Sequence, residues 1–287
     1  MNEDSIKIAR DYLDSLLVES RIIGATRPST KVSILGEEFD TPIMTSALSH
    51  IDLVNMALGA KKIGAFVSIG MGDNDEMKKV LDTGAKVMKI IKPYADKEEI
   101  LSRLKFAEEN GAFAVGMDVE HSVNVNDPED SVVVGKQMKL PTMEELKEYV
   151  EYTKLPFFIN GALSVHDAIK ARELGCKGII LSHHNGLMRC AVPPVMLLPE
   201  IRDAVGDDLI LIADGGFETG FDCFKALALG ADLVSVGKKL MDPLKEKGAD
   251  GVAEVMSSMT CELAAMMLRT SSQDPSSIDP SVIWRMN

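Results

Sequence analysis

The chain has 287 residues, of which 46% are hydrophobic and 26% charged, a composition typical of globular proteins. Its formal net charge of -13 argues against nucleic acid and anionic membrane surfaces as partners. Residues 1–17 predict an amphipathic helix without a signal-peptide core, and no uncharged apolar run approaches a membrane span, so we expect a cytoplasmic protein. The four cysteines form no CxxC pair, which predicts reduced thiols and no metal site.

After the N-terminal helix come two extended segments, VESRII (18–23) and KVSILGEEF (31–39). We expect the helix and both segments to cap the bottom of the domain that follows. Eight short apolar runs then alternate with amphipathic, helix-forming stretches. The runs are 41–48, 65–69, 86–91, 112–119, 156–161, 178–183, 209–215 and 231–237. A further helix is expected at about 250–269, before a short turn-rich tail.

This alternation is typical of a parallel sheet covered by helices. Eight units with no break in composition favour a closed (β/α)8 TIM barrel over an open doubly wound sheet. We therefore predict one barrel domain, with an N-terminal helical and extended cap (1–40), the barrel (41–247), and a C-terminal helix and tail (248–287).

In such a barrel, the carboxyl ends of all eight strands meet around one mouth, where active sites lie. The long polar loop 120–141 after the fourth strand is a candidate lid. The predicted strand ends supply Ser46, Ser68, Lys89, Asp118, Asn160, His184, Asp214 and Gly237.

Two glycine-rich segments predict a phosphate site. ADGGFETG (213–220) follows the seventh strand, and SVGKK (235–239) follows the eighth. Glycine lets backbone amides approach an anion closely, and a following helix N-terminus adds its dipole. Lys238 could add a positive charge. The alternative is that these glycines only form tight turns.

Asp118 and His184 are candidates for an acid–base pair across the mouth. A carboxylate on one imidazole nitrogen fixes the tautomer and stabilises the ring when the other nitrogen takes a proton. His183, the neighbouring histidine, is interpreted as structural and directed away from the site. Lys89 could face a ligand, with Lys92 as the competing candidate.

These residues, in this order, resemble the FMN-dependent 2-hydroxy-acid oxidase and dehydrogenase family, which includes glycolate and lactate oxidases and mandelate dehydrogenase. The likeness covers nearly the whole barrel and is most specific at 209–238 and 261–272. It implies an FMN cofactor, a small-molecule substrate and a homo-oligomer. His184 takes the place of the proton-abstracting histidine, and Asp118 that of its orienting aspartate. Residues matching flavin or ribityl phosphate contacts are Ser46, Ala47, Ser68, Asp214, Gly215, Gly216, Gly237 and Lys238.

The chain also departs from this family. Asn160 replaces a lysine that stabilises negative charge on the flavin, and Lys89 replaces a strand-three glutamine, so Lys89 could assume the lost function. Leu187 replaces an arginine that binds the substrate carboxylate. Losing that arginine removes two charge-assisted hydrogen bonds unless Arg189 or Lys89 replaces it, so the expected substrate is not a simple 2-hydroxy acid.

Two rival hypotheses keep the barrel. A phosphate site beside an Asp–His pair would also suit an isomerase or lyase acting on a phosphorylated metabolite. Alternatively, the chain could be a degenerate barrel that binds FMN without turnover. Fold resemblance alone does not choose among them.

Overall fold

The computed structural model describes residues 4–120, 136–184, 188 and 190–285. Its centre is an eight-stranded sheet in which each strand lies parallel to its neighbours. The strands are β4 (Ile43–Thr45), β5 (Val67–Ile69), β6 (Val87–Ile91), β7 (Ala114–Asp118), β8 (Phe157–Asn160), β9 (Gly178–Leu181), β10 (Ile210–Asp214) and β11 (Leu233–Val236). All eight predicted strands are confirmed.

The sheet curls into a barrel because β4 pairs with β11 on one side and meets β5 on the other. Thr45 makes the second junction: its Oγ1 donates to the Ser68 carbonyl (3.0 Å) and accepts from the Ser68 amide (2.9 Å). Leu48 and Ile69 form a parallel bridge just beyond. The predicted (β/α)8 fold is therefore confirmed.

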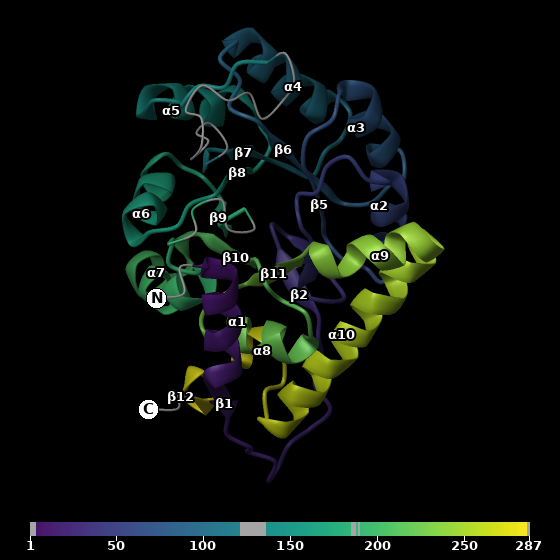
Figure 1. The fold of residues 1–287 in the computed structure, drawn as a ribbon, viewed down its shortest axis with the longest axis vertical. Helices are drawn as coiled ribbons and strands as arrows, with labels where there is room; N and C mark the ends of the chain where they lie inside the picture. Colours follow the sequence, from purple (N-terminus) through teal and green to yellow (C-terminus); the bar gives the residue numbers. More distant parts are fainter. Residues whose placement is uncertain (1–3, 121–135, 185–187, 189, 286–287) are drawn as a thin grey trace.

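Helices surround the sheet, most of them between successive strands (Figure 1). They are α2 (Leu53–Lys62), α3 (Asn74–Leu81), α4 (Lys97–Glu109), α5 (Met143–Tyr152), α6 (Val165–Glu173), α7 (Pro194–Val205), α8 (Gly220–Ala228), α9 (Lys238–Lys247) and α10 (Ala249–Arg269). The short 3-10 turns are Gly206–Asp208, Pro275–Ser277 and Pro280–Val282. Side-chain caps open most of these helices; for example, Thr142 and Glu145 form a reciprocal capping box at α5.

The core has two layers, which show the direction in which each strand residue points. Met88 and Ile90 of β6 belong to the cluster inside the barrel, whereas Val87 and Ile91 pack in the larger cluster shared with the helices. Since successive strand residues face opposite sides of a sheet, this alternation assigns each residue near a strand end to the interior or to the helix layer.

The predicted cap is only partly correct. The antiparallel hairpin of β2 (Val32–Ile34) and β3 (Glu37–Phe39) joins the inner cluster through Ile34 and Phe39, as expected for a bottom plug. The first segment does not join it, because β1 (Leu16–Val18) pairs with β12 (Ile283–Arg285) near the C-terminus.

Helix α1 (Ser5–Ser15) does not cap the bottom either. It lies outside the barrel against α7, and its Arg10 binds both carboxylate oxygens of Asp222 at the start of α8 (3.0 and 2.8 Å). The side chain of Lys225 also donates to the Leu13 carbonyl (2.6 Å). The amphipathic face of α1 thus packs on neighbouring helices.

Within the part of the chain that the structure describes, α10 is the one helix long and apolar enough to cross a membrane, which the sequence analysis did not expect. It packs against α2, α8 and α9, and its buried side chains include Met256, Leu263 and Met267. One such helix is weak evidence for a membrane span, and 33% of its apolar window is buried inside the protein.

Candidate active site

The inner layer brings most of the predicted site residues to one end of the barrel. Counting outward from the buried interior residues places Ser46, Ser68, Asp118, Asn160 and Asp214 on the inward face of their strands. These are carboxyl ends of parallel strands, so their side chains surround the predicted mouth.

Lys89 is the exception, and the role expected for it needs correction. It shares the outward face of β6 with Val87 and Ile91, and its ammonium donates to the Gly70 carbonyl between the sheet and the helices. Burial, helped by the charge of Arg103, lowers the pKa of Lys89 to about 8. The inward-facing lysine is Lys92, two positions beyond Ile90 and only 6% exposed.

A chain of alternating charges crosses the mouth from β6 to the loop after β9. Lys92 Nζ lies 2.5 Å from Asp118 Oδ2, and the same oxygen lies 2.9 Å from His184 Nε2. The other imidazole nitrogen, Nδ1 of His184, bonds to Oε2 of Glu120. The predicted contact between Asp118 and His184 is therefore present, and each nitrogen of the ring meets a carboxylate.

These contacts change the acid strength of His184. Burial alone would lower its pKa, but the hydrogen bonds and charges of Asp118 and Glu120 outweigh burial and raise the pKa to about 9. At neutral pH the ring is therefore an imidazolium with both N–H groups directed at carboxylates.

Glu120 is a site residue that the sequence analysis missed. It lies two residues after β7, and the Val119 amide, which donates to the Asn160 carbonyl (3.0 Å), anchors the backbone beside it. Gly161, at φ +93°, lies directly against it: a Cβ there would come within 2.8 Å of Glu120 Cβ and 3.2 Å of His184 Cε1. The contact therefore depends on glycine at 161, a signal visible only once the strands are paired.

Asp214, on the opposite side of the mouth, has neutral partners. Its Oδ1 accepts hydrogen bonds from the hydroxyls of Ser46 (2.6 Å) and Ser235, and its Oδ2 accepts from Ser182 (2.7 Å). Because these serines belong to or directly follow β4, β11 and β9, Asp214 ties three strands to the end of β10. Ser182 also accepts from the His184 amide (3.2 Å), so it joins the two sides.

The two predicted phosphate-binding segments differ in how open they are. At α8, the protein's own side chains bind the first amides: Asp222 accepts from Glu218 and Thr219 (3.0 and 3.1 Å), and Glu262 accepts from Gly220 (2.7 Å). At α9, the N-cap residue Gly237 provides no side-chain cap. The available positive helix end is therefore that of α9.

The glycines around this helix end differ in how much space surrounds them. Gly237 lies so close to Ser46 that a Cβ would come within 3.1 Å of it, whereas a Cβ at Gly216 would meet only Ala9, at 3.9 Å. Gly215 lies against the ring of His183, a buried histidine. Among the described residues, the buried hydroxyl of Ser68 has no hydrogen-bond partner, which leaves a polar atom available to a ligand.

Ala47 lies beside the inner cluster, and Lys238, the first residue of α9, is exposed. Several predictions concern residues outside those that the structure describes. These residues are most of the candidate lid (121–135), Leu187, which replaces the carboxylate-binding arginine, and Arg189, its candidate substitute.

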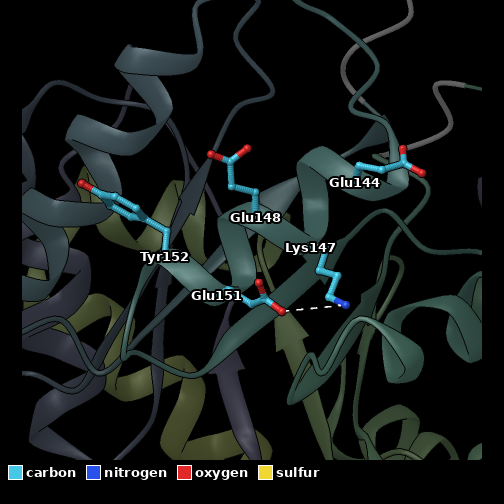
Figure 2. A pocket seen from close by; sticks show the side chains of 5 residues that line it. All are labelled: Glu144, Lys147, Glu148, Glu151 and Tyr152. Carbon is cyan, nitrogen blue, oxygen red and sulfur yellow. Dashed lines mark ion pairs between the residues drawn. The ribbon is translucent and has the colours of Figure 1, made fainter.

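A separate shallow depression lies on the outer face of α5 (Figure 2). Its lining residues are Glu144, Lys147, Glu148, Glu151 and Tyr152. All five come from one helix of the outer layer, so the groups do not converge as they do at the mouth. This surface is not a candidate active site.

The family model of the FMN-dependent dehydrogenases matches residues 1–133 and 124–285. A 2-hydroxyacid oxidase of Dictyostelium discoideum is 37% identical over 147 residues, which are 51% of this chain and 38% of that protein. An L-lactate oxidase of Lactobacillus jensenii is 25% identical over 307 residues, covering 94% of this chain and 75% of that protein. The chain thus matches well under half the length of the first of these relatives.

Solved structures agree on the fold. A mandelate oxidase crystal structure superposes with a TM-score of 0.89 at 22% identity, covering 100% of this chain and 91% of the oxidase. The family model names FMN as the cofactor, which matches the open helix end and the unpartnered hydroxyl at the mouth. The chain therefore belongs to the FMN-dependent dehydrogenase family.

Proposed function

We propose that this protein is an FMN-dependent oxidoreductase in which His184 exchanges a proton with the substrate. The observation that carries the proposal is the Asp118–His184 contact at the same barrel mouth as the open N-terminus of α9. When bound, FMN supplies the hydride acceptor or donor. The protein then has to hold the cofactor, orient the substrate and move one proton.

The phosphate end of FMN would be held at the start of α9. The amides at Gly237 and Lys238 carry the positive end of the helix dipole, and the ammonium of Lys238 adds charge. Ser68 would donate to a polar atom of the ring system, because its buried hydroxyl has no partner among the described residues. Asp214 would act indirectly, by fixing Ser46 beside Gly237.

Asp118 would position His184 for proton transfer. The carboxylate is 2% exposed and pairs with Lys92, so it is a fixed anchor for Nε2 of the ring. Nδ1, which Glu120 contacts, is then the nitrogen left to exchange a proton with a substrate. The ring is an acid while it is an imidazolium and a base once one nitrogen has lost its proton.

The substrate class follows from the charges at the mouth. The inward-facing cations among the described residues there are Lys92 and His184, and both are paired with carboxylates. A substrate carboxylate would compete with Asp118 for Lys92. We therefore propose a substrate other than a simple 2-hydroxy acid, for example a hydroxy compound with a neutral group in place of the carboxylate. A cytoplasmic location and self-association remain predictions.

Visible absorption spectroscopy of the purified protein tests the cofactor, and anaerobic bleaching of the flavin tests the substrate class. We expect bound or readily acquired FMN, and faster bleaching by a 2-hydroxy amide or ester than by the matching 2-hydroxy acid. His184→Gln should keep the flavin and lose the bleaching. A protein that takes up no FMN, or a His184→Gln variant that still turns over normally, would contradict the proposal.

A further inference from the structure

Glu120 makes His184 unlike a simple Asp–His pair. The carboxylate bonds to Nδ1, the nitrogen that the proposed reaction needs, while Asp118 holds Nε2. The side chain of Glu120 is 19% exposed and that of Asp118 is 2% exposed, so Glu120 is the partner on the solvent side. A ring held in this way has no nitrogen lone pair free to abstract a proton.

Charged and polar groups from the neighbouring strands and loops surround the His184 ring. Lys92 of β6 neutralises part of the charge of Asp118, and Asn160 of β8 contributes only a neutral amide, 3.4 Å from Nε2. His183 precedes His184 in the chain, and Asp214 is linked through Ser182 to the backbone amide of His184, not to its ring. Among the residues that the structure describes, Asp118 and Glu120 are the carboxylates that contact the ring directly, so together they favour its charged form.

We propose that Glu120 is a positioning residue that holds His184 as an imidazolium and occupies its reactive nitrogen, so that the site becomes a base only after Glu120 moves off Nδ1 and the ring loses that proton. This inference rests on the proposed function. The Nδ1 proton passes to water as Glu120 leaves the ring, and Glu120 remains a carboxylate. His184 is then neutral, with Nδ1 exposed and Nε2 still bonded to Asp118.

Gly161 provides an independent way to separate the two side chains. A methyl group there would stand 2.8 Å from Glu120 Cβ, at a backbone angle that L residues rarely adopt, so Gly161→Ala should displace Glu120. Glu120→Gln leaves the shape of the side chain unchanged and removes its charge. The two variants break the same contact through different atoms.

The test is a nitrogen-15 NMR pH titration of the imidazole groups, with the His184 signal assigned by its loss in His184→Gln. The chain has only five histidines, so the signals can be separated. In the unmodified protein, the His184 signal should stay that of an imidazolium until pH is near 9. In Glu120→Gln and Gly161→Ala, its midpoint should fall by at least about one pH unit, and Glu120→Asp should restore part of the shift.

Glu151→Gln, a change of an exposed carboxylate on α5, is the matched control and should leave the titration unchanged. A His184 midpoint near 6.5 in the unmodified protein, or one that Glu120→Gln does not move, would overturn the proposal. The titration needs neither flavin nor turnover. A protein that fails to bind FMN but shows the expected shift would therefore contradict the proposed function alone.

Discussion

Asp118 and Asp214 are both inward-facing carboxylates at the mouth of the barrel, yet they are stabilised in different ways. Cations balance Asp118, whose Oδ2 contacts Lys92 and His184. Neutral hydroxyls balance Asp214, which accepts from three serines. A charge balanced by cations can change the protonation of its partners, whereas one held by hydroxyls mainly fixes strands in place. The β6–β9 side therefore suits proton chemistry, and the β10–β11 side suits a rigid cofactor cradle.

The largest expected effect comes from removing the buried charge on the reactive side. Asp118→Asn leaves Lys92, whose side chain is 7% exposed, facing an amide, and breaking a buried pair in this way costs about 3–5 kcal/mol. Urea unfolding measures the loss. Asp11→Asn, in the exposed pair with Lys7, should cost no more than about 0.5 kcal/mol. A loss of less than ~1 kcal/mol for Asp118→Asn would mean that this ion pair does not organise the mouth.

The reactive side should also make stability depend on pH. The folded-state pKa of His184, about 9, lies above the ordinary value of 6.5, so its contribution is complete below pH 6.5 and is lost as pH rises through 9. The shift corresponds to a contribution on the order of 3 kcal/mol. Urea unfolding across this range should show declining stability in the unmodified protein and a flatter profile in Glu120→Gln. If stability fell with pH equally in both proteins, the Glu120–His184 contact would not be the source of the pH dependence.

Asp214→Asn should have a smaller cost. The amide keeps one acceptor oxygen for the serines but loses the charge and the second acceptor, so we expect about 2 kcal/mol of lost unfolding free energy. The His184 titration should hardly move, because the hydrogen-bonded link from Asp214 runs through Ser182 to the backbone amide of His184 and not to its ring. If Asp214→Asn shifted the His184 midpoint as far as Asp118→Asn did, the two carboxylates would not have separate roles.

The cofactor cradle can be tested at Gly237 with a pair of substitutions. Gly237→Ala and Gly237→Asp introduce the same Cβ beside Ser46, but only aspartate places a negative charge at the start of α9. The Asp variant should bind FMN at least about tenfold more weakly than the Ala variant, a difference of about 1.4 kcal/mol. Aspartate is a good N-cap, so the Asp variant should be no less stable than the Ala variant. Equal FMN affinities would place the phosphate elsewhere.

The smallest effects should come from single hydroxyls. Ser46→Ala and Ser182→Ala each remove one hydrogen bond from Asp214, at a cost of about 1 kcal/mol each. Only Ser182 also accepts from the His184 amide, so only Ser182→Ala should perturb the His184 NMR signal. The same perturbation in both variants would show that Asp214 transmits changes to the reactive side.

Sequence reasoning predicted the eight strands well because each is a short apolar run between helix-forming stretches. It also placed Ser46, Ser68, Asp118, Asn160 and Asp214 at or near the ends of these runs, and the structure has them on the inward face. It was wrong about Lys89, because both faces of a barrel strand are apolar and the run KVMKII does not reveal which face is inside. Counting from the end of that run would have favoured Lys92.

Other parts of the site depend on contacts that no local pattern encodes. Glu120 reaches His184 across 64 positions, and its approach depends on the space left by Gly161, the residue after β8. Arg10 binds Asp222 across 212 positions, which draws α1 onto the outside of the barrel. An amphipathic pattern predicts that a helix packs on something, but not on which surface.

The roles assigned to the two carboxylates depend on where FMN lies between them, so the most direct measurement is a crystal structure of the protein with FMN. We predict the phosphate at the amides of Gly237 and Lys238, a polar ring atom at the Ser68 hydroxyl, and the side chain of His184 facing the flavin with Asp118 still on Nε2. Density for the phosphate at the closed N-terminus of α8, or a flavin ring remote from His184, would contradict it.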